Sequence, residues 1–386
     1  MSTRASNGAR SPRRWRYIPA ALAVFAVGLS ACAGSGPQSA LEPQSPQAES
    51  INNLWLLVYY IAAVIFFLVM GALVYTIIRY RERPGDDRQP VQLHGNTALE
   101  ITWTIIPAVI LAVIAVPTVR GVFDMREVPT GDDVVNVRVT GHQWWWEFEY
   151  VDYANAAGET LVTANELHLP VGREANFVMT SADVIHSFWI PPLMGKRDVV
   201  PGRITDLSFE PSNVTPPGQP IFGQCAEFCG LSHADMRMRV FIDSEAGFEE
   251  WIAHQASASP VPTEGLAAQG WETFNQVCTA CHRSTVDDEG TVETLGPASS
   301  IDVADDRFTS SLAPNLTHFG SRTTLAAATY DNTVEHLSAW LANPPALKPM
   351  DPDRNDIAAG EIYGMPNFNL DDSEIAGLIA LLQLWE

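Results

Sequence analysis

Two long apolar stretches near the N-terminus constrain the possible folds of this chain more than any other feature. Residues 54–78 carry no charged side chain, and residues 101–119 are nearly as apolar. Each stretch meets the ~20 residues that an α-helix needs to cross a bilayer, and the first is too long for an ordinary buried core helix. We therefore predict a membrane hairpin at 53–120, with helices at about 54–79 and 98–119.

The charged residues around these stretches indicate the orientation of the hairpin. The connecting segment 79–96, RYRERPGDDRQPVQLHGN, carries four arginines and one histidine. Cytoplasmic loops are enriched in Lys and Arg, so this segment is predicted to be cytoplasmic and both outer ends of the hairpin extracytoplasmic. The N-terminus agrees, because the basic segment 13–16 precedes an apolar run at 17–29, as in a secretory signal.

The apolar run ends in LSAC, residues 29–32, which resembles the lipobox of bacterial lipoproteins. In such proteins the signal is removed and the cysteine is lipidated. The resemblance therefore implies a signal peptide at 1–31 and a lipid anchor at Cys32; the alternative is an ordinary signal with an incidental cysteine. The Pro-, Gln- and Ser-rich residues that follow predict a flexible linker at 32–52.

The net charge limits the partners of the chain. The protein has 386 residues, which is room for two or three domains, and its formal net charge is −22. Nucleic acids and anionic lipid surfaces both attract Lys and Arg, so neither is an expected partner. A basic partner protein, or an exposed extracytoplasmic surface, fits this charge.

Residues 133–241 show the period-two pattern of β-strands. Short segments alternate apolar and polar side chains between turns rich in Gly and Pro, and they lie at 134–141, 166–172, 175–182, 204–211 and 236–243. Regularly spaced short strands predict an all-β sandwich or barrel, which we place at 130–253. A rigid β-scaffold suits electron transfer, because it limits the movement of metal ligands between redox states.

The segment 224–236, QCAEFCGLSHADM, concentrates groups that bind soft metals. Its candidate ligands, together with one histidine upstream, are Cys225, Cys229, His233, Met236 and His186. Thiolate, imidazole and thioether groups together favour copper over hard cations. Two bridging thiolates can hold two coppers with one histidine each, which leaves Met236 for one copper and the carbonyl of Glu227 for the remaining position.

A structural zinc site is the alternative for this segment. Two thiolates and two imidazoles form an acceptable tetrahedral set for zinc, namely Cys225, Cys229, His186 and His233. That assignment leaves Met236 unexplained. A copper pair explains why two cysteines are present, because both thiolates bridge the two metals. The two coppers share one electron, so the metal–ligand bond lengths change little on reduction.

A second redox motif follows a linker predicted at 254–264. The segment Cys278-x-x-Cys281-His282 is the attachment motif of c-type haem. Both thiols add to the haem vinyl groups, and the histidine reaches the iron. A thioredoxin-like redox pair is the alternative, but no βαβ pattern surrounds it.

The iron needs a sixth ligand, and Met365 is the preferred candidate over Met350. Pro366 follows Met365, and an amphipathic helix capped by Asp371 or Asp372 comes next. Class I cytochromes c resemble this arrangement, so residues 265–386 are predicted to form an all-α class I cytochrome c domain. The same resemblance implies that segment 314–318 lies near the haem and that Arg322 contacts a propionate, although inserts at about 298–312 and between Lys348 and Met365 depart from the family pattern.

The copper segment resembles the dinuclear copper A loop of the cytochrome c oxidase subunit II family. The likeness extends from the hairpin to about residue 242 and includes GHQWWWEFEY at 141–150, SADVIHSFWIP at 181–191 and KRDVVPGR at 196–203. It implies a two-helix anchor and a cupredoxin-like sandwich. The implied copper ligands are His186, Cys225, the carbonyl of Glu227, Cys229, His233 and Met236.

The resemblance implies roles for three further side chains. The carboxylate of Glu227 matches a ligand of a magnesium ion at the contact with subunit I, and Trp144 matches the aromatic residue that receives electrons from cytochrome c. On physical grounds alone, alternation of core and surface on one strand explains part of the run at 144–146. Glu100 matches a glutamate at the mouth of a proton channel, and it also completes a capping box with Thr97.

Together the motifs imply subunit II of a caa-type oxidase with a fused cytochrome c. Such a chain passes electrons from haem c through the copper pair to haem a of subunit I, where oxygen is reduced to water with proton pumping. The implied partners are subunit I and the other oxidase subunits, the membrane lipid, and a cytochrome c or quinol–cytochrome c reductase as electron donor. The implied location is a bacterial cell membrane, with both soluble domains outside.

A membrane-tethered copper and haem electron shuttle, or a copper-handling protein without an oxidase partner, belongs to a different functional class. The hairpin and Glu100 count against it, because a shuttle needs only a lipid anchor. A quinol oxidase subunit II shares the hairpin but lacks copper ligands. A nitrous oxide reductase has the copper loop but needs a large histidine-rich propeller domain.

Overall fold

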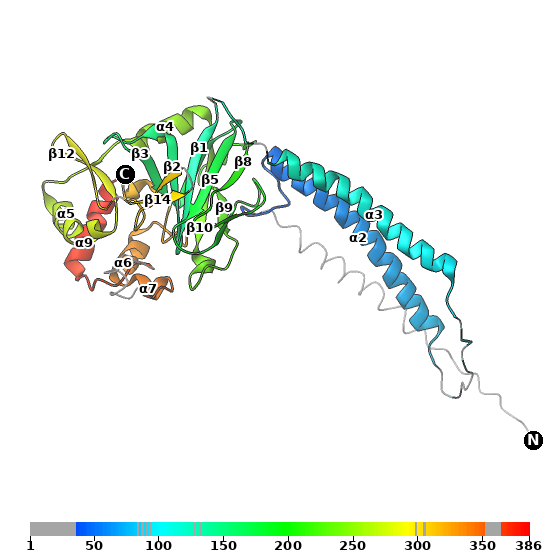
Figure 1. Ribbon diagram of the computed structural model, residues 1–386. Helices are drawn as coiled ribbons and strands as arrows, with labels where there is room; N and C mark the ends of the chain where they lie inside the picture. Colours follow the sequence, from blue (N-terminus) through cyan, green and yellow to red (C-terminus); the bar gives the residue numbers. More distant parts are fainter. Residues whose placement is uncertain are drawn as a thin grey trace, which may run out of the picture.

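Two long helices project from a body that contains a β-sandwich and a smaller, mainly helical domain (Figure 1). The computed structural model describes residues 36–386 except 83–84, 86–88, 90, 93, 127, 132, 298, 304–305 and 352–363. The predicted signal peptide and Cys32 lie outside the described residues, so the lipid anchor stays a prediction.

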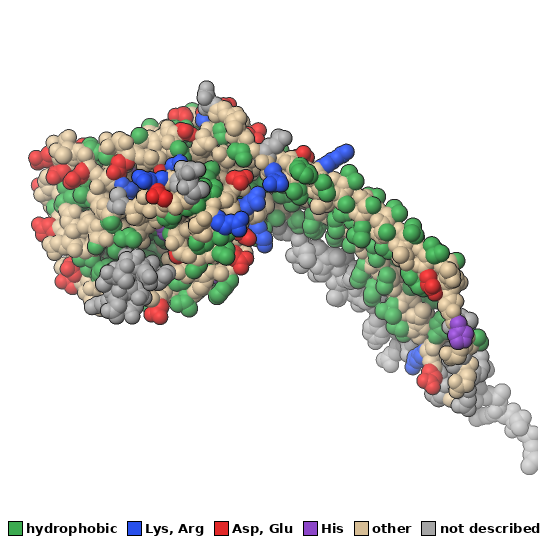
Figure 2. Space-filling model, viewed as in Figure 1, with side chains coloured by type: hydrophobic (Ala, Val, Ile, Leu, Met, Phe, Trp, Pro, Cys, Tyr) green, Lys and Arg blue, Asp and Glu red, His purple; other side chains and the backbone are tan. Residues whose placement is uncertain are grey.

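Helices α2 (Pro46–Arg79) and α3 (Thr97–Asp124) are the two described helices long and apolar enough to cross a membrane. They run side by side, and apolar side chains cover their exposed surface (Figure 2). The prediction that residues 32–52 form a flexible linker is wrong at its end, because α2 begins at Pro46. The Ser45 side chain caps this helix by accepting a hydrogen bond from the Ala48 amide, and proline suits the first turn.

The residues before α2 are also docked on the sandwich. The amide of Gln44 donates to the carbonyl of Pro192 at 2.7 Å, and the carbonyl of Gln44 accepts from the amide of Ser212 at 2.8 Å. The Ser45 hydroxyl donates to the carbonyl of Leu193. A composition rich in Pro, Gln and Ser does not reveal such contacts, because they depend on a distant surface.

The β-domain is the predicted cupredoxin-like sandwich. One sheet has the order β3-β2-β1-β5-β8 and the other β4-β10-β9-β6-β7. Their bounds are β1 (Val135–His142), β2 (Trp145–Ala154), β3 (Thr160–Ala164), β4 (Glu166–Pro170), β5 (Ala175–Ser181), β6 (His186–Trp189), β7 (Arg197–Val199), β8 (Thr205–Phe209), β9 (Ile221–Cys225) and β10 (Arg237–Asp243). All five predicted strand segments are strands, and their inward side chains, such as Val139, Phe177 and Val240, are fully buried.

The segment between the domains is ordered. Helix α4 (Glu245–Ala256) packs Phe248 and Ile252 into the sandwich core and extends into the predicted linker. Strand β11 (Ser259–Pro260) then pairs with β12 (Ser284–Asp288) of the next domain. The linker is therefore part of both folded domains rather than a free tether.

The C-terminal domain has a helical core with added short strands. Its helices are α5 (Gly265–Val277), α6 (Val334–Ala342), α7 (Pro344–Leu347) and α9 (Asp372–Leu384), and its strands are β12 (Ser284–Asp288), β13 (Thr291–Leu295), β14 (Ser300–Val303), β15 (Asp306–Thr309), β16 (Thr324–Leu325) and β17 (Tyr330–Asp331). The predicted cap of the last helix is confirmed, since Asp371 forms a capping box with Glu374. Short strands accompany the predicted helical core, and the predicted insert forms the β14–β15 hairpin.

Helices α5 and α9 cross at two glycines. A Cβ atom built on Gly270 would lie 2.0 Å from the carbonyl oxygen of Gly377, so no side chain fits between the two backbones. The crossing brings Phe274, at the end of α5, against Trp385, with ring centroids 5.0 Å apart. It places the start of the haem motif, directly after α5, against this core.

Buried polar contacts dock the two soluble domains on each other. One carboxylate oxygen of Glu166 in β4 accepts hydrogen bonds from the amide and hydroxyl of Thr323, at 2.9 and 2.6 Å, and of Thr324, at 3.0 and 3.1 Å. Arg283 pairs with Glu159 at 2.6 Å. Since a buried carboxylate without partners is costly, this arrangement favours one fixed relation between the domains.

Candidate functional site

Five metal-binding side chains converge at one end of the sandwich. They come from β6, from the end of β9 and from the loop that leads to β10. The Cys225 sulfur lies 3.8 Å from the Cys229 sulfur and 3.9 Å from Nδ1 of His186. The Cys229 sulfur lies 3.6 Å from Nδ1 of His233 and 3.9 Å from the Met236 sulfur. The sulfur separation is far beyond a disulfide bond, so both thiols are available to metals.

The backbone carbonyl of Glu227 and its side-chain carboxylate have different surroundings. Its backbone carbonyl oxygen lies 3.2 Å from the Cys225 sulfur and so faces the cluster. Its side chain is exposed. The two groups that the resemblance assigns to different metals therefore face different surroundings, and the magnesium role stays a prediction.

The environment of the two sulfurs favours the metal-binding thiolate form at Cys225 but not at Cys229. The contact with the Cys229 thiol lowers the pKa of Cys225 to about 3, and the contact with His186 acts in the same sense, although burial opposes both. The pKa of Cys229 is raised, because it serves as a donor to Cys225 and is itself buried. A thiolate is the nucleophilic and metal-binding form of cysteine, so Cys225 is prepared to be the first ligand.

Asp183 orients His186 and is a residue that the sequence analysis missed. Its Oδ1 lies 2.8 Å from Nε2 of His186, and its Oδ2 accepts from the amide of Gln143 at 2.6 Å. A carboxylate that binds the second ring nitrogen fixes the tautomer and points Nδ1 at the sulfurs. The available signal was the spacing of Asp183 three residues before His186.

Gly141 in β1 allows His186 to occupy this position. A Cβ atom built on Gly141 would lie 2.8 Å from Cδ2 of the His186 ring. Any side chain there would displace the imidazole. This glycine is needed for a close approach of backbone and ring rather than for a turn.

Trp144 lies between the metal cluster and the C-terminal domain. Its indole Nε1 donates to the backbone carbonyl of Cys229 at 2.8 Å, and the Gln143 side chain donates to the same oxygen at 2.7 Å. All three tryptophans at 144–146 are buried, so the expected alternation of core and surface is wrong. The C-terminal domain covers the outer face, where Ala327 packs against Trp145.

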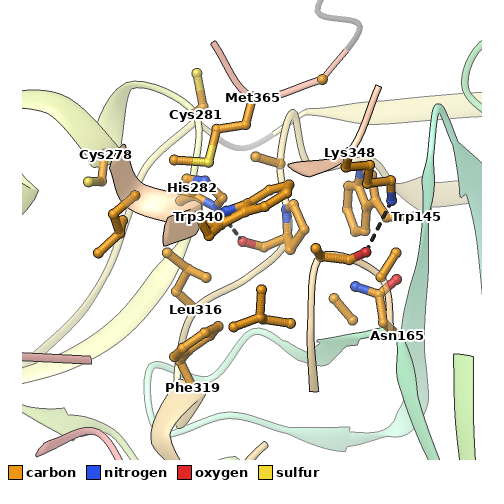
Figure 3. A pocket seen from close by; sticks show the side chains of 18 of the residues that line it. Trp145, Asn165, Cys278, Cys281, His282, Leu316, Phe319, Trp340, Lys348 and Met365 are labelled. Atoms are coloured by element: carbon orange, nitrogen blue, oxygen red, sulfur yellow. Dashed lines mark hydrogen bonds between the residues drawn. The ribbon is translucent and has the colours of Figure 1, made fainter. Parts of the chain in front are cut away.

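A large cavity at the junction of the domains is lined by the haem motif. Cys278, Cys281 and His282 line one part of it, and Trp144 and Trp145 line another. Its empty space of about 1310 Å³ includes open solvent. The mostly apolar lining, with the haem motif on one side, suits a haem group (Figure 3).

His282 is held in the form that an iron ligand requires. Its Nδ1 lies 2.7 Å from the carbonyl oxygen of Pro314, so Nδ1 carries the proton and Nε2 keeps its lone pair. Burial lowers the pKa of His282, which favours the neutral ring. Pro314 belongs to the segment 314–318 that was expected near the haem.

Both candidate methionines line the cavity, but they belong to different cores. Met365 packs with the core of the C-terminal domain, which also includes Cys278, whereas Met350 packs against the sandwich core. Figure 3 shows the Met365 side chain extending toward His282. This difference favours Met365 as the partner of His282 across a haem.

Lys348 is a second residue that the sequence analysis did not select. It is 3% exposed. Its Nζ donates to the carbonyl oxygens of Trp144, at 2.7 Å, and Ala326, at 3.2 Å. Burial lowers the pKa of Lys348 to about 7. Its sequence context, LKPMDPD, contains no motif that predicts these contacts.

Glu100 lies in the first turn of α3 and is exposed. The predicted cap Thr97 is wrong by one residue, because Asn96 accepts from the amides of Ala98 and Leu99 at 3.1 and 3.3 Å. A Glu100 carboxylate oxygen accepts from the Asn96 amide at 3.3 Å. The capping contact is therefore present with Asn96 as its first member, and the proton-channel role stays a prediction.

Comparisons with known proteins match the hairpin and both of the domains that follow it. Residues 37–120 match the transmembrane domain of cytochrome c oxidase subunit II, residues 135–243 match its periplasmic domain, and residues 267–385 match the cytochrome c family. Cytochrome c oxidase subunit 2 of Alkalihalophilus pseudofirmus is 36% identical over 86% of this chain and 89% of its own length. The subunit of the same name from Bacillus subtilis is 32% identical over 87% of this chain and 91% of its own length.

Proposed function

The chain belongs to the cytochrome c oxidase subunit II family and carries a C-terminal cytochrome c domain, and from this premise we propose that it passes electrons from its own haem c to a copper pair and on to subunit I. In the proposal, subunit I reduces oxygen to water with proton pumping, as in caa-type oxidases. The observation that carries it is the position of Trp144, which lines the haem cavity and is hydrogen-bonded to the carbonyl of Cys229.

The proposed copper ligands are His186, Cys225, the carbonyl of Glu227, Cys229, His233 and Met236. The assignment is supported by the sulfur and imidazole nitrogen atoms of these side chains, whose neighbouring pairs lie 3.6–3.9 Å apart. Three of the residues, His186, Cys225 and Cys229, also form a buried group whose ligand atoms lie close together. His186 and Cys225 lie on strands β6 and β9, the other ligands lie in the loop before β10, and Asp183 orients His186. When bound, the copper pair and the haem supply the one-electron chemistry.

The proposed haem ligands are His282 and Met365, with thioether bonds at Cys278 and Cys281. The support is their common position around one cavity and the hydrogen bond between His282 and Pro314. Methionine and histidine ligands raise the potential of a haem that carries electrons. The fixed docking through Glu166 keeps the two centres at a constant separation, so electron transfer needs no diffusional encounter.

The remaining assignments concern the membrane and the partners. We propose that α2 and α3 contact subunit I, that Glu100 takes up protons at the cytoplasmic end, and that the Glu227 carboxylate binds magnesium at the contact with subunit I. The proposed electron donor is a cytochrome c or quinol–cytochrome c reductase. We further propose that Cys32 is lipidated and that both soluble domains are extracytoplasmic.

The test is a purification of the complex from its native membrane, followed by electron paramagnetic resonance and metal analysis. Two coppers per chain, a hyperfine pattern from one electron shared by two copper nuclei, and co-purification of haem a support the proposal. A chain that isolates without haem a would instead be an electron shuttle. A single copper or a zinc in replete protein would contradict the dinuclear site.

A further inference from the structure

The charge of the haem cavity is unusual for this acidic chain. Apart from His282, the described residues that line it include two basic side chains, Arg322 and Lys348, and no acidic one. The whole protein has a formal net charge of −22, and Lys348 is one of its two lysines. A cavity lined by cations alone fits an anionic ligand group, and haem carries two propionates.

The ammonium group of Lys348, a residue that lines the cavity, has one donor without an acceptor among the described residues. An ammonium has three donors, and the contacts of Nζ are the carbonyls of Trp144 and Ala326. Among the described residues, no carboxylate forms a salt bridge with Lys348, although the charge of Asp235 acts on it, and the side chain is 3% exposed. A buried cation without an anionic partner is costly, so the cavity presents a position where an anion is favoured.

The position of Lys348 matches one edge of the expected haem. Thioether bonds at Cys278 and Cys281 fix the vinyl edge, and the propionates leave from the opposite edge of the macrocycle. Figure 3 shows Lys348 and Trp145 across the cavity from Cys278. His282 and Met365 lie between these two ends, where the iron would be held.

We propose that Lys348 binds a haem propionate and, through its hydrogen bond to the Trp144 carbonyl, ties the propionate edge of the haem to the copper domain. The inference rests on the proposed haem c. It gives Lys348 two effects, since the ammonium neutralises a propionate beside the iron and holds that edge of the haem against Trp144. Arg322, which also lines the cavity, is the candidate for the other propionate.

The test uses the purified oxidase complex with Lys348→Met, Lys348→Arg and a matched control, Arg307→Gln. Arg307 is an exposed cation on the β14–β15 hairpin of the same domain. The readout is the midpoint potential of haem c, with haem content checked first. A nearby cation stabilises the reduced haem, so K348M is expected to shift the reduction equilibrium about tenfold toward the oxidised form, or ~59 mV for a one-electron couple.

The variants separate charge from packing. K348R keeps the cation and is expected to restore most of the potential, whereas R307Q is expected to leave it unchanged. An unaltered potential in K348M with full haem content would overturn the inference. If haem c is absent from the wild-type chain, the proposed function fails first, and the two failures are therefore distinguishable.

If the K348M chain does not retain haem, a second measurement, made on the wild-type complex, tests the inference. A structure of the wild-type complex is expected to show a propionate oxygen within ~3.2 Å of Nζ of Lys348. Both propionates directed away from Lys348 would overturn the inference without any variant.

Discussion

The indole nitrogen of Trp144 donates a hydrogen bond to the backbone carbonyl of Cys229, and the two atoms are 2.8 Å apart. The carbonyl of Trp144 in turn accepts from Lys348 at 2.7 Å. One residue is therefore bonded to the copper loop by its side chain and to the haem domain by its backbone. Five predictions follow from this arrangement and from the surroundings of both sites.

Replacement of Trp144 by Phe is expected to slow electron transfer from haem c to the copper pair. The change removes the hydrogen bond to the Cys229 carbonyl and with it a contact that links the haem cavity to the copper loop. Flash-induced oxidation of haem c measures this step. Trp251→Phe, on α4, is the control, and equal rates in both variants would contradict a role for Trp144.

Replacement of Asp183 by Asn is expected to weaken copper binding by about 10–100-fold, as loss of such carboxylate partners typically does. The ring of His186 then loses the charged acceptor at Nε2 that holds Nδ1 toward the sulfurs. Copper content after dialysis against a graded chelator measures the effect. Asp206→Asn, at an exposed position of β8, should retain copper, and full retention in Asp183→Asn would show that His186 is oriented otherwise.

Replacement of Met365 by Ala is expected to remove the methionine–iron absorption band of ferric haem c and to lower its potential, because a thioether ligand favours the reduced iron. Met350→Ala, which truncates a side chain packed on the sandwich core, should keep both properties. Spectra of the two variants, compared at equal haem content, show which methionine binds the haem iron. The reverse pattern would assign the ligand to Met350.

Replacement of Gly270 by Ala is expected to destabilise the cytochrome domain by about 1–3 kcal/mol or more, since an added Cβ would overlap the Gly377 carbonyl. The melting temperature is measured from the change of the haem c spectrum on heating, and the change in the free energy of unfolding is obtained from it. Gln269→Ala, an exposed neighbour on α5, is the control. A wild-type melting temperature in Gly270→Ala would mean that the two helices separate at little cost.

Glu147 is expected to make the protein less stable as the pH rises. Burial raises the pKa of Glu147 to about 8, with the Ser311 amide donating to one of its oxygens at 3.1 Å. The folded state then binds more protons than the unfolded state between the usual value of 4.5 and about 8, so stability falls across that window. Each pKa unit corresponds to about 1.4 kcal/mol.

Thermal unfolding of the wild type and of Glu147→Gln at pH 5.5 and 8.5 tests this sign. The Gln variant carries no titrating group at this position, so its melting temperature should decline less with pH. Identical declines in both proteins would show that Glu147 is ionised in the fold.

Features with short sequence spacing were predictable from the sequence alone. The apolar spans, the period-two strands, the copper loop at 225–236 and the attachment motif at 278–282 depend on near neighbours, because helix and strand geometry impose a fixed repeat. The cap at Asp371 is local in the same way. The start of α2 at Pro46 was also locally encoded by Ser45, but the composition of the segment concealed it.

The tertiary structure alone decided how the two redox domains meet. Lys348 reaches Trp144 across 204 positions, and Glu166 reaches Thr324 across 158. Burial of Trp145 against Ala327 follows from the same docking, whereas Trp146 is buried in the sandwich core itself. Such contacts depend on two surfaces fitting each other, and surface complementarity leaves no periodic trace in either segment. The sequence therefore determined which groups can bind copper and haem, whereas the packing of the domains decided that a buried lysine and a tryptophan join the two sites.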